Sequence, residues 1–326
     1  GGALVNSYQP LPWQGDLLAD LLRQHQAGQL GHALLVSGPA GVGKATLVRS
    51  LVATILCDQG SEGHACGQCP PCVQLEAGSH PDLLWVKRRE DERSGKLKRD
   101  IAIDQVREMI ERLSLAAQYG RGKFAVIDRV DELNVAGRNA ILKTLEEPPP
   151  ATVLILLSER PLGLPATVRS RCRRLRVPPP SRDAAEAWLQ AQGLDDTWLT
   201  WAGGAPLQVA AWAAEQTDAH FRRWEQGLSA IAQDRGDPLS VSAEIGRDAV
   251  PLFVEWLIRW LHQMLRKGLL GERVPVPAAF LEPVITEALA ARGELAGNVN
   301  PQLVLESLLG LWWRQTRLAT RAVQSA

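Results

Sequence analysis

The residues with the clearest capacity for chemistry lie in a glycine-rich run from Gly38 to Ala45, which reads GPAGVGKA. Glycines at this spacing let backbone N–H groups cradle phosphate, and Lys44 is placed to reach the β- and γ-phosphates of a nucleotide. The next position normally carries Ser or Thr, whose hydroxyl holds Mg²⁺. Ala45 offers no oxygen, and Thr46 is rotated by about 100° from the required direction on a helix. The sequence predicts a phosphate cradle that has lost a metal ligand.

The predicted nucleotide-contacting residues are Gly38, Gly41, Gly43, Lys44 and Thr46. Because the cradle is intact and the metal position is not, the sequence leaves open whether this site binds ATP or ADP.

A second nucleotide-site signal is the apolar run 124–127 followed by Asp128, which is typical of a strand whose terminal Asp helps to hold Mg²⁺. Hydrolases with this pattern usually continue with a Glu that positions the attacking water, but here the next residue is Arg129. A cation cannot accept the proton of that water. Asp131 and Glu132 follow beyond the strand end, out of register with the required position. The pattern therefore predicts a site without its catalytic carboxylate.

Four cysteines form the third signal, with one at the end of a predicted helix and three in a C-x-x-C-x-x-C run. They are Cys57, Cys66, Cys69 and Cys72. Four thiolates can close a tetrahedron around Zn²⁺ and leave no position for water, so the metal would be structural. Unmetallated thiols and an iron-sulfur cluster are the alternatives, and the cluster is disfavoured because nothing else indicates redox chemistry.

Composition narrows the class of protein. The 326 residues are 45% apolar and carry 36 basic and 36 acidic side chains, so no overall positive charge attracts nucleic acid, although a local basic patch stays open. The longest apolar stretch, 252–265, contains Glu255 and Arg259 at its centre, which argues against a membrane span. Clustered cysteines and the lack of a signal-peptide pattern favour a cytoplasmic protein.

Short apolar runs and helical periodicities alternate through the first half of the chain. The runs are 32–37, 82–86, 124–128 and 153–158, and the helical patterns between them include 44–56, 103–117 and 133–145. Buried strands that alternate with helices predict a parallel α/β sheet. The charged stretch 87–100 is expected to be a solvated loop without an assigned function.

The second half of the chain is predicted to be helical. Three prolines at 178–180 favour an extended connector, a capped helix is expected over 181–192, and another helix begins near Leu207. From about residue 218 only helical periodicity is found, and most tryptophans fall here, which indicates an aromatic core. The expected domains are 1–178, 179–217 and 218–326.

The run from 139 to 149, which reads NAILKTLEEPP, is followed by Ser170, Arg171 and Cys172. Together with the cysteine module, this order closely resembles the bacterial DNA polymerase III clamp-loader subunits. The resemblance implies an AAA+ parallel-sheet P-loop domain with an inserted zinc module, a small helical lid domain and a C-terminal α-helical collar for oligomerisation.

Two types of subunit in that family carry these marks: the ATP-hydrolysing motors, called gamma or tau, and a delta-prime type that resembles a motor with a disabled site. Ala45 and Arg129 favour the delta-prime type, as does the segment 203–207, which lacks the Arg of the motor lid. By resemblance, the chain is a non-hydrolysing stator of the DNA polymerase III holoenzyme. Arg171 would be an arginine finger offered in trans to ATP on a neighbouring motor, with an internal salt bridge as its alternative.

The implied partners are gamma or tau motors and a delta subunit in a ring, with the sliding clamp and primed DNA reached through the complex. The implied location is the bacterial cytoplasm, near the nucleoid during replication. Three alternatives remain open: a gamma- or tau-type motor, an autonomous ATPase that uses Thr46 and Glu132, and a zinc-dependent DNA-binding adaptor.

Overall fold

The computed structural model describes residues 8–60, 64–91, 95, 97–98, 100–272, 274–295, 297 and 299–324. The chain divides into two compact units, residues 1–210 and 211–326. The finer division into 1–178, 179–217 and 218–326 stays a prediction. Part of the predicted loop 87–100, namely 92–94, 96 and 99, lies outside the described residues.

The first unit is built on a five-stranded parallel sheet, as the alternating pattern predicted. Its strands are β1 (Ala33–Ser37), β2 (Leu83–Val86), β3 (Lys123–Ile127), β4 (Thr152–Ser158) and β5 (Arg173–Arg176), in the order β2-β3-β4-β1-β5. The first four coincide with the apolar runs. The strand β5 was not predicted, because three of its four residues are arginines and it lies at the sheet edge, where no alternating apolar pattern is needed.

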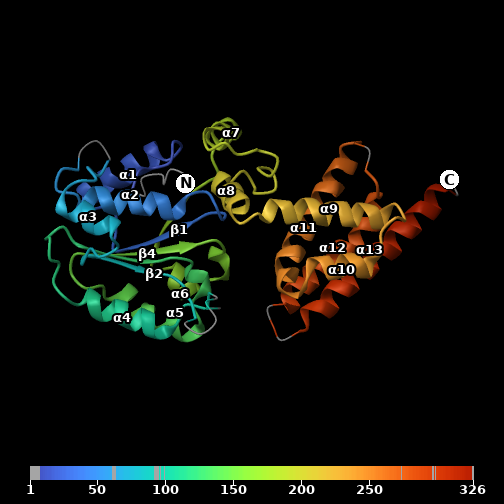
Figure 1. Ribbon diagram of the computed structural model, residues 1–326. Coiled ribbons are helices and arrows are strands. Elements are labelled where there is room, and N and C mark those ends of the chain that lie inside the picture. Colours follow the sequence, from blue (N-terminus) through green and yellow to red (C-terminus); the bar gives the residue numbers. More distant parts are fainter. Residues whose placement is uncertain are drawn as a thin grey trace. The chain divides into compact units, whose positions relative to one another are not determined.

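Helices cover both faces of this sheet (Figure 1). One layer contains α1 (Gly15–Gln26) and α2 (Lys44–Leu56), with α3 (Pro70–Glu76) packed on α2, and the opposite layer contains α4 (Ile103–Leu113), α5 (Val135–Glu146) and α6 (Ala166–Arg169). Successive residues of β1, such as Leu34 and Leu35, are both buried although they point to opposite faces. Burial on both faces explains why the strands read as continuous apolar runs.

The helix predicted over 103–117 ends earlier, at Leu113. Beyond it, the backbone N–H groups of Gln118 and Tyr119 both donate to the carboxylate of Asp82, at 2.9 Å each. These two bonds tie the segment after α4 to the residue that precedes β2.

The helices expected after the prolines are present as α7 (Arg182–Ala191) and α8 (Pro206–Ala214). Ser181 caps α7, since its hydroxyl accepts the backbone N–H of Ala184 at 3.3 Å. Short 3₁₀ turns η1 (Val130–Glu132) and η2 (Pro161–Gly163) follow the ends of β3 and β4.

The second unit is helical, as expected, and contains α9 (Thr217–Ala232), α10 (Pro238–Ile245), η3 (Arg247–Ala249), α11 (Val250–Leu269), α12 (Ala278–Glu294) and α13 (Pro301–Gln324). Its core holds Trp224, Trp256, Trp260 and Trp312, all buried. Trp312 donates its indole N–H to the carbonyl of Leu228 at 2.9 Å, so these rings are structural and not available for stacking on bases. Within the described residues, no helix combines the length and hydropathy that a membrane span requires.

Candidate functional site

The glycine-rich loop connects the end of β1 to the start of α2, which is the position of a phosphate cradle in a parallel sheet. Gly41 and Gly43 adopt φ of 75° and 93°, a region that favours glycine. The Lys44 ammonium donates to the carbonyls of Gly38 and Pro39, both at 2.7 Å. Burial lowers the pKa of Lys44, and the nearby charge of Glu159 opposes this shift. Four of the predicted cradle residues thus lie together: Gly38, Gly41, Gly43 and Lys44. The Lys44 side chain turns back onto the loop.

The N-terminus of α8 lies against this loop. The backbone N–H of Leu207 donates to the carbonyl of Gly41 at 3.2 Å, and a Cβ added at Gly41 would lie 2.3 Å from the backbone nitrogen of Gln208. The sequence of α8, PLQVAAWAA, contains no Arg or Lys. The helix α8 therefore reaches the cradle without supplying a cation to it.

A contact that the sequence analysis missed braces the other side of the loop. The side-chain amide of Gln14, which is buried, donates to the carbonyl of Gly43 at 2.9 Å. Gln14 precedes α1 by one residue and lies far from the loop in sequence, so no local pattern identifies it. Thr46, the remaining predicted cradle residue, lies half-buried in the first turn of α2.

Arg129 occupies the place where the water-positioning carboxylate was expected. It follows Asp128 with φ of 60°, and its guanidinium pairs with Glu132 at 3.2 Å and with Glu159 at 3.3 Å. Glu132 also pairs with Arg88 at 2.8 Å. Burial disfavours the charged form, but the adjacent carboxylates, led by Glu159, outweigh it and raise the pKa of Arg129. A permanent cation neutralised by two carboxylates thus stands at the end of β3.

Both carboxylate oxygens of Asp131 are engaged in hydrogen bonds within the fold. Its carboxylate accepts the hydroxyl of Ser158 and the backbone N–H of Glu159, both at 2.7 Å, and so fixes the end of β4. Asp128 accepts the indole N–H of Trp85 at 3.4 Å. Neither Asp131 nor Glu132 presents an unengaged carboxylate of the kind that a general base requires.

Arg171 lies just beyond α6, with its side chain 35% exposed. Its guanidinium donates to the carbonyl of Thr167 at 2.9 Å and pairs with the carboxylate of Glu146 at 2.5 Å. The internal salt bridge weighed as an alternative from the sequence is therefore present. In the described structure the hydrogen-bond and ion-pair partners of the Arg171 side chain are these two residues and not the glycine-rich loop. Cys172 is buried, and burial raises its pKa to about 11, so it is a protonated core thiol.

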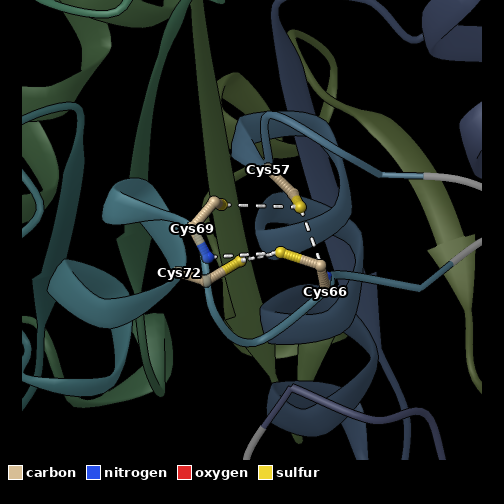
Figure 2. A group of neighbouring side chains, drawn as sticks. All are labelled: Cys57, Cys66, Cys69 and Cys72. Carbon is tan, nitrogen blue, oxygen red and sulfur yellow. Dashed lines mark hydrogen bonds between the residues drawn. The ribbon is translucent and has the colours of Figure 1, made fainter.

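The four clustered cysteines converge at the end of α2, in the following loop and at the start of α3 (Figure 2). Their sulfur atoms all lie within 4.8 Å of one another, with 3.8 Å between Cys57 and Cys69 and 4.0 Å between Cys66 and Cys72. Zn–S bonds of about 2.3 Å in a tetrahedron place sulfur atoms about 3.8 Å apart. The cluster therefore has the dimensions of a Cys₄ zinc site.

Backbone donors support thiolate ligands in this cluster. The backbone N–H groups of Gln68 and Cys69 donate to the Cys66 sulfur at 3.4 and 3.3 Å, and they lower the pKa of Cys66 to about 6. Burial has the opposite effect and raises the pKa of Cys57 and Cys72. A metal ion would stabilise the deprotonated form of these buried thiols. With all four thiolates as ligands, a bound metal would have no open position for catalysis.

Comparison with known proteins agrees with the motifs. Residues 13–181 match a protein-family model described as DNA polymerase III, delta subunit. The chain is 29% identical to DNA polymerase III subunit delta' of Pseudomonas aeruginosa, over 92% of this chain and 96% of the relative. It is 32% identical to DNA polymerase III subunit delta' of Escherichia coli K12, over 92% and 86%.

Sequence similarity to tau subunits covers less of the chain. DNA polymerase III subunit tau of Salmonella typhimurium is 33% identical, but over 52% of this chain and 27% of that protein. The crystal structure of a DNA polymerase III gamma subunit-related protein from Thermotoga maritima has a TM-score of 0.54 and 16% identity, and covers 92% of this chain and 99% of the other. At this identity the likeness concerns the fold alone. From the family match and the delta' relatives aligned over most of its length, the chain belongs to the DNA polymerase III subunit delta' family.

Proposed function

We propose that this protein is a non-hydrolysing subunit of the clamp loader in the DNA polymerase III holoenzyme. The observation that carries the proposal is the ion-paired Arg129 at the place of the catalytic carboxylate, together with Ala45 at the place of the metal-binding hydroxyl. ATP hydrolysis needs both a positioned metal and a positioned water. A fold that keeps the phosphate cradle but lacks the groups that position the metal and the water suits a non-hydrolysing member of a ring of ATPases.

In this proposal, Arg171 acts as an arginine finger on ATP bound by the adjacent gamma or tau motor. A guanidinium is permanently charged and presents a planar fork to phosphate oxygens, so a finger supplied in trans stabilises the charge that develops on the γ-phosphate. The partly exposed position of Arg171 at the end of a short helix allows contact with another subunit. The remaining proposed partners are a delta subunit, the sliding clamp and primed DNA.

The proposed cofactor is one structural Zn²⁺, held by Cys57, Cys66, Cys69 and Cys72. We assign no catalytic role to a nucleotide bound at the cradle, which consists of Gly38, Gly41, Gly43, Lys44 and Thr46. The proposed location is the bacterial cytoplasm, with access to the nucleoid during replication.

The second candidate is an ATP-hydrolysing motor of the gamma or tau type. It is favoured by the intact cradle and by the 33% identity to a tau subunit over half of the chain. A reconstituted clamp loader separates the two, when Lys44→Ala is placed in this subunit alone. The stator proposal predicts unchanged ATP turnover by the complex, because no hydrolysis occurs at this cradle. A motor would lose the whole contribution of this subunit, and that result would overturn the proposal.

A further inference from the structure

The ion pair between Arg171 and Glu146 joins two of the sequence motifs on which the family resemblance depends. Glu146 is the last residue of α5, and Arg171 follows α6, which packs against α5 (Figure 1). One terminal nitrogen of the Arg171 guanidinium lies 2.5 Å from a carboxylate oxygen of Glu146, and the other donates to the carbonyl of Thr167 at 2.9 Å. Both arms of the fork that would meet phosphate oxygens are therefore engaged within the chain.

This arrangement cannot persist while Arg171 contacts the γ-phosphate of ATP. A carboxylate beside the guanidinium would cancel its charge and repel the phosphate oxygens, since both are anions. The Arg171 and Glu146 side chains are 35% and 49% exposed, and pairs this accessible to water are weak. Separation of the pair therefore costs little, yet the pair still competes with the phosphate for the same N–H groups.

We propose that Glu146 is a positioning residue that holds Arg171 in a withdrawn position until ATP on the adjacent subunit displaces it. The inference rests on the proposed role of Arg171 as a finger in trans. Glu146 acts through Arg171 and has no contact of its own with the nucleotide. Its role is to lower the apparent affinity of the neighbouring site for ATP while this subunit is not correctly seated.

The chain offers a matched control one residue away. Glu147 is exposed, follows α5 directly and has no ion pair with Arg171 in the described structure. Glu146→Gln and Glu147→Gln remove the same charge from nearly the same place. A difference between the two variants therefore reports on the pair with Arg171 and not on net charge.

The first measurement uses a reconstituted clamp loader in which only this subunit is varied. ATP affinity and the steady-state KM and kcat are determined, and the relevant site is the one that Arg171→Ala weakens. Glu146→Gln is expected to tighten ATP binding there and to lower its KM by about two- to fivefold, the range of an exposed ion pair, with little change in kcat. The gain should shrink at high salt, which screens the pair in the unmodified protein, and should vanish in Glu146→Gln/Arg171→Ala.

The second measurement uses the isolated chain and does not depend on assembly. The rate at which phenylglyoxal modifies Arg171 is followed by mass spectrometry, and Glu146→Gln is expected to raise it while Glu147→Gln leaves it unchanged. Equal rates in all three proteins would show that Glu146 does not restrain the guanidinium.

The outcomes separate the inference from the proposed function. If Arg171→Ala leaves ATP binding and turnover unchanged in an intact complex, the finger role fails and the inference fails with it. If Arg171→Ala impairs the complex but Glu146→Gln has no effect or weakens ATP binding, the finger role stands and the restraint by Glu146 is wrong. Equal gains in both Gln variants would also overturn the inference, because they would assign the effect to general charge.

Discussion

Arg129 and Glu159 form an ion pair across the ends of two adjacent strands, with 3.3 Å between the guanidinium of the first and the carboxylate of the second. Arg129 follows β3, at the place where an ATPase of this fold needs a carboxylate to position water. Glu159 follows the neighbouring strand β4. The two charges of the pair neutralise each other near Lys44, where Glu159 raises and Arg129 lowers the pKa of the lysine. The substitution at 129 is therefore part of a folded ion-pair arrangement and not an isolated loss.

From this arrangement we expect the isolated chain to have negligible ATPase activity. Ala45→Ser alone should not create an active enzyme, because the hydroxyl returns a metal ligand while Arg129 still occupies the place of the carboxylate. The check is steady-state phosphate release by the purified chain and by this variant. Turnover on the order of 1 per second that Lys44→Ala abolishes would contradict the expectation.

The close approach of α8 to the glycine-rich loop predicts a specific cost for a methyl group at Gly41. Gly41→Ala adds a Cβ only 2.3 Å from the backbone nitrogen of Gln208, at φ of 75°. We expect a loss of about 2–4 kcal/mol in unfolding free energy, from left-handed strain and overpacking together. Gly28→Ala is the control, since its φ is 68° and its Cβ would have open space. It should cost about 1 kcal/mol. Urea unfolding compares the two, and equal losses would exclude tight packing of α8 on the loop.

The cysteine geometry predicts one tightly bound zinc per chain. Cys69→Ser should release the metal and lower the melting temperature, because binding energy at a structural site is folding energy. Cys172→Ala removes a cysteine outside the cluster and should leave zinc content unchanged. Elemental analysis of carefully purified proteins provides the test, and unmetallated wild-type protein would argue for free thiols instead.

Acid pH should destabilise the first unit through His80. The ring is buried, its Nδ1 accepts the backbone N–H of Asp82 at 3.1 Å, and burial lowers its pKa, with a smaller opposing effect from Asp82. The unfolded chain therefore binds this proton more readily than the folded chain. The stability contributed by neutral His80 is present above about pH 6.5 and is lost as the pH falls through the interval below it.

The measurement is unfolding free energy between about pH 8 and about pH 5 for the wild type and for His80→Gln. Whatever its stability at neutral pH, the variant should lose less on acidification, because Gln does not titrate. Parallel pH profiles would show that His80 does not contribute to the acid sensitivity.

Much of the first unit follows from local sequence, and the part that does not depends on contacts between distant segments. The apolar runs predicted β1 to β4 because both faces of the sheet are buried, whereas the arginine-rich β5 carries no such signal. The cysteine spacing likewise predicted a cluster that the fold closes. Glu159 and Gln14 could not be assigned to the nucleotide site, since their partners lie far away in the chain.

The same limit applies to Arg171. The sequence placed it in a recognisable triplet, but its pairing with Glu146 depends on how α5 packs against α6. Periodicity identifies which side chains are buried in a helix, and it does not specify which exposed carboxylate meets which exposed guanidinium.

The proposed role of Arg171 as a finger in trans can be measured through the ATPase and clamp-loading rates of a reconstituted complex that carries Arg171→Ala in this subunit alone. We expect normal folding, zinc content and assembly with a marked loss of ATP turnover at the one adjacent interface, since the charge that develops on the γ-phosphate would lose its partner. Arg171→Lys should restore little, because a point charge does not reproduce the planar fork. Unchanged rates for both reactions in a fully assembled complex would contradict the finger role and leave Arg171 as a structural partner of Glu146.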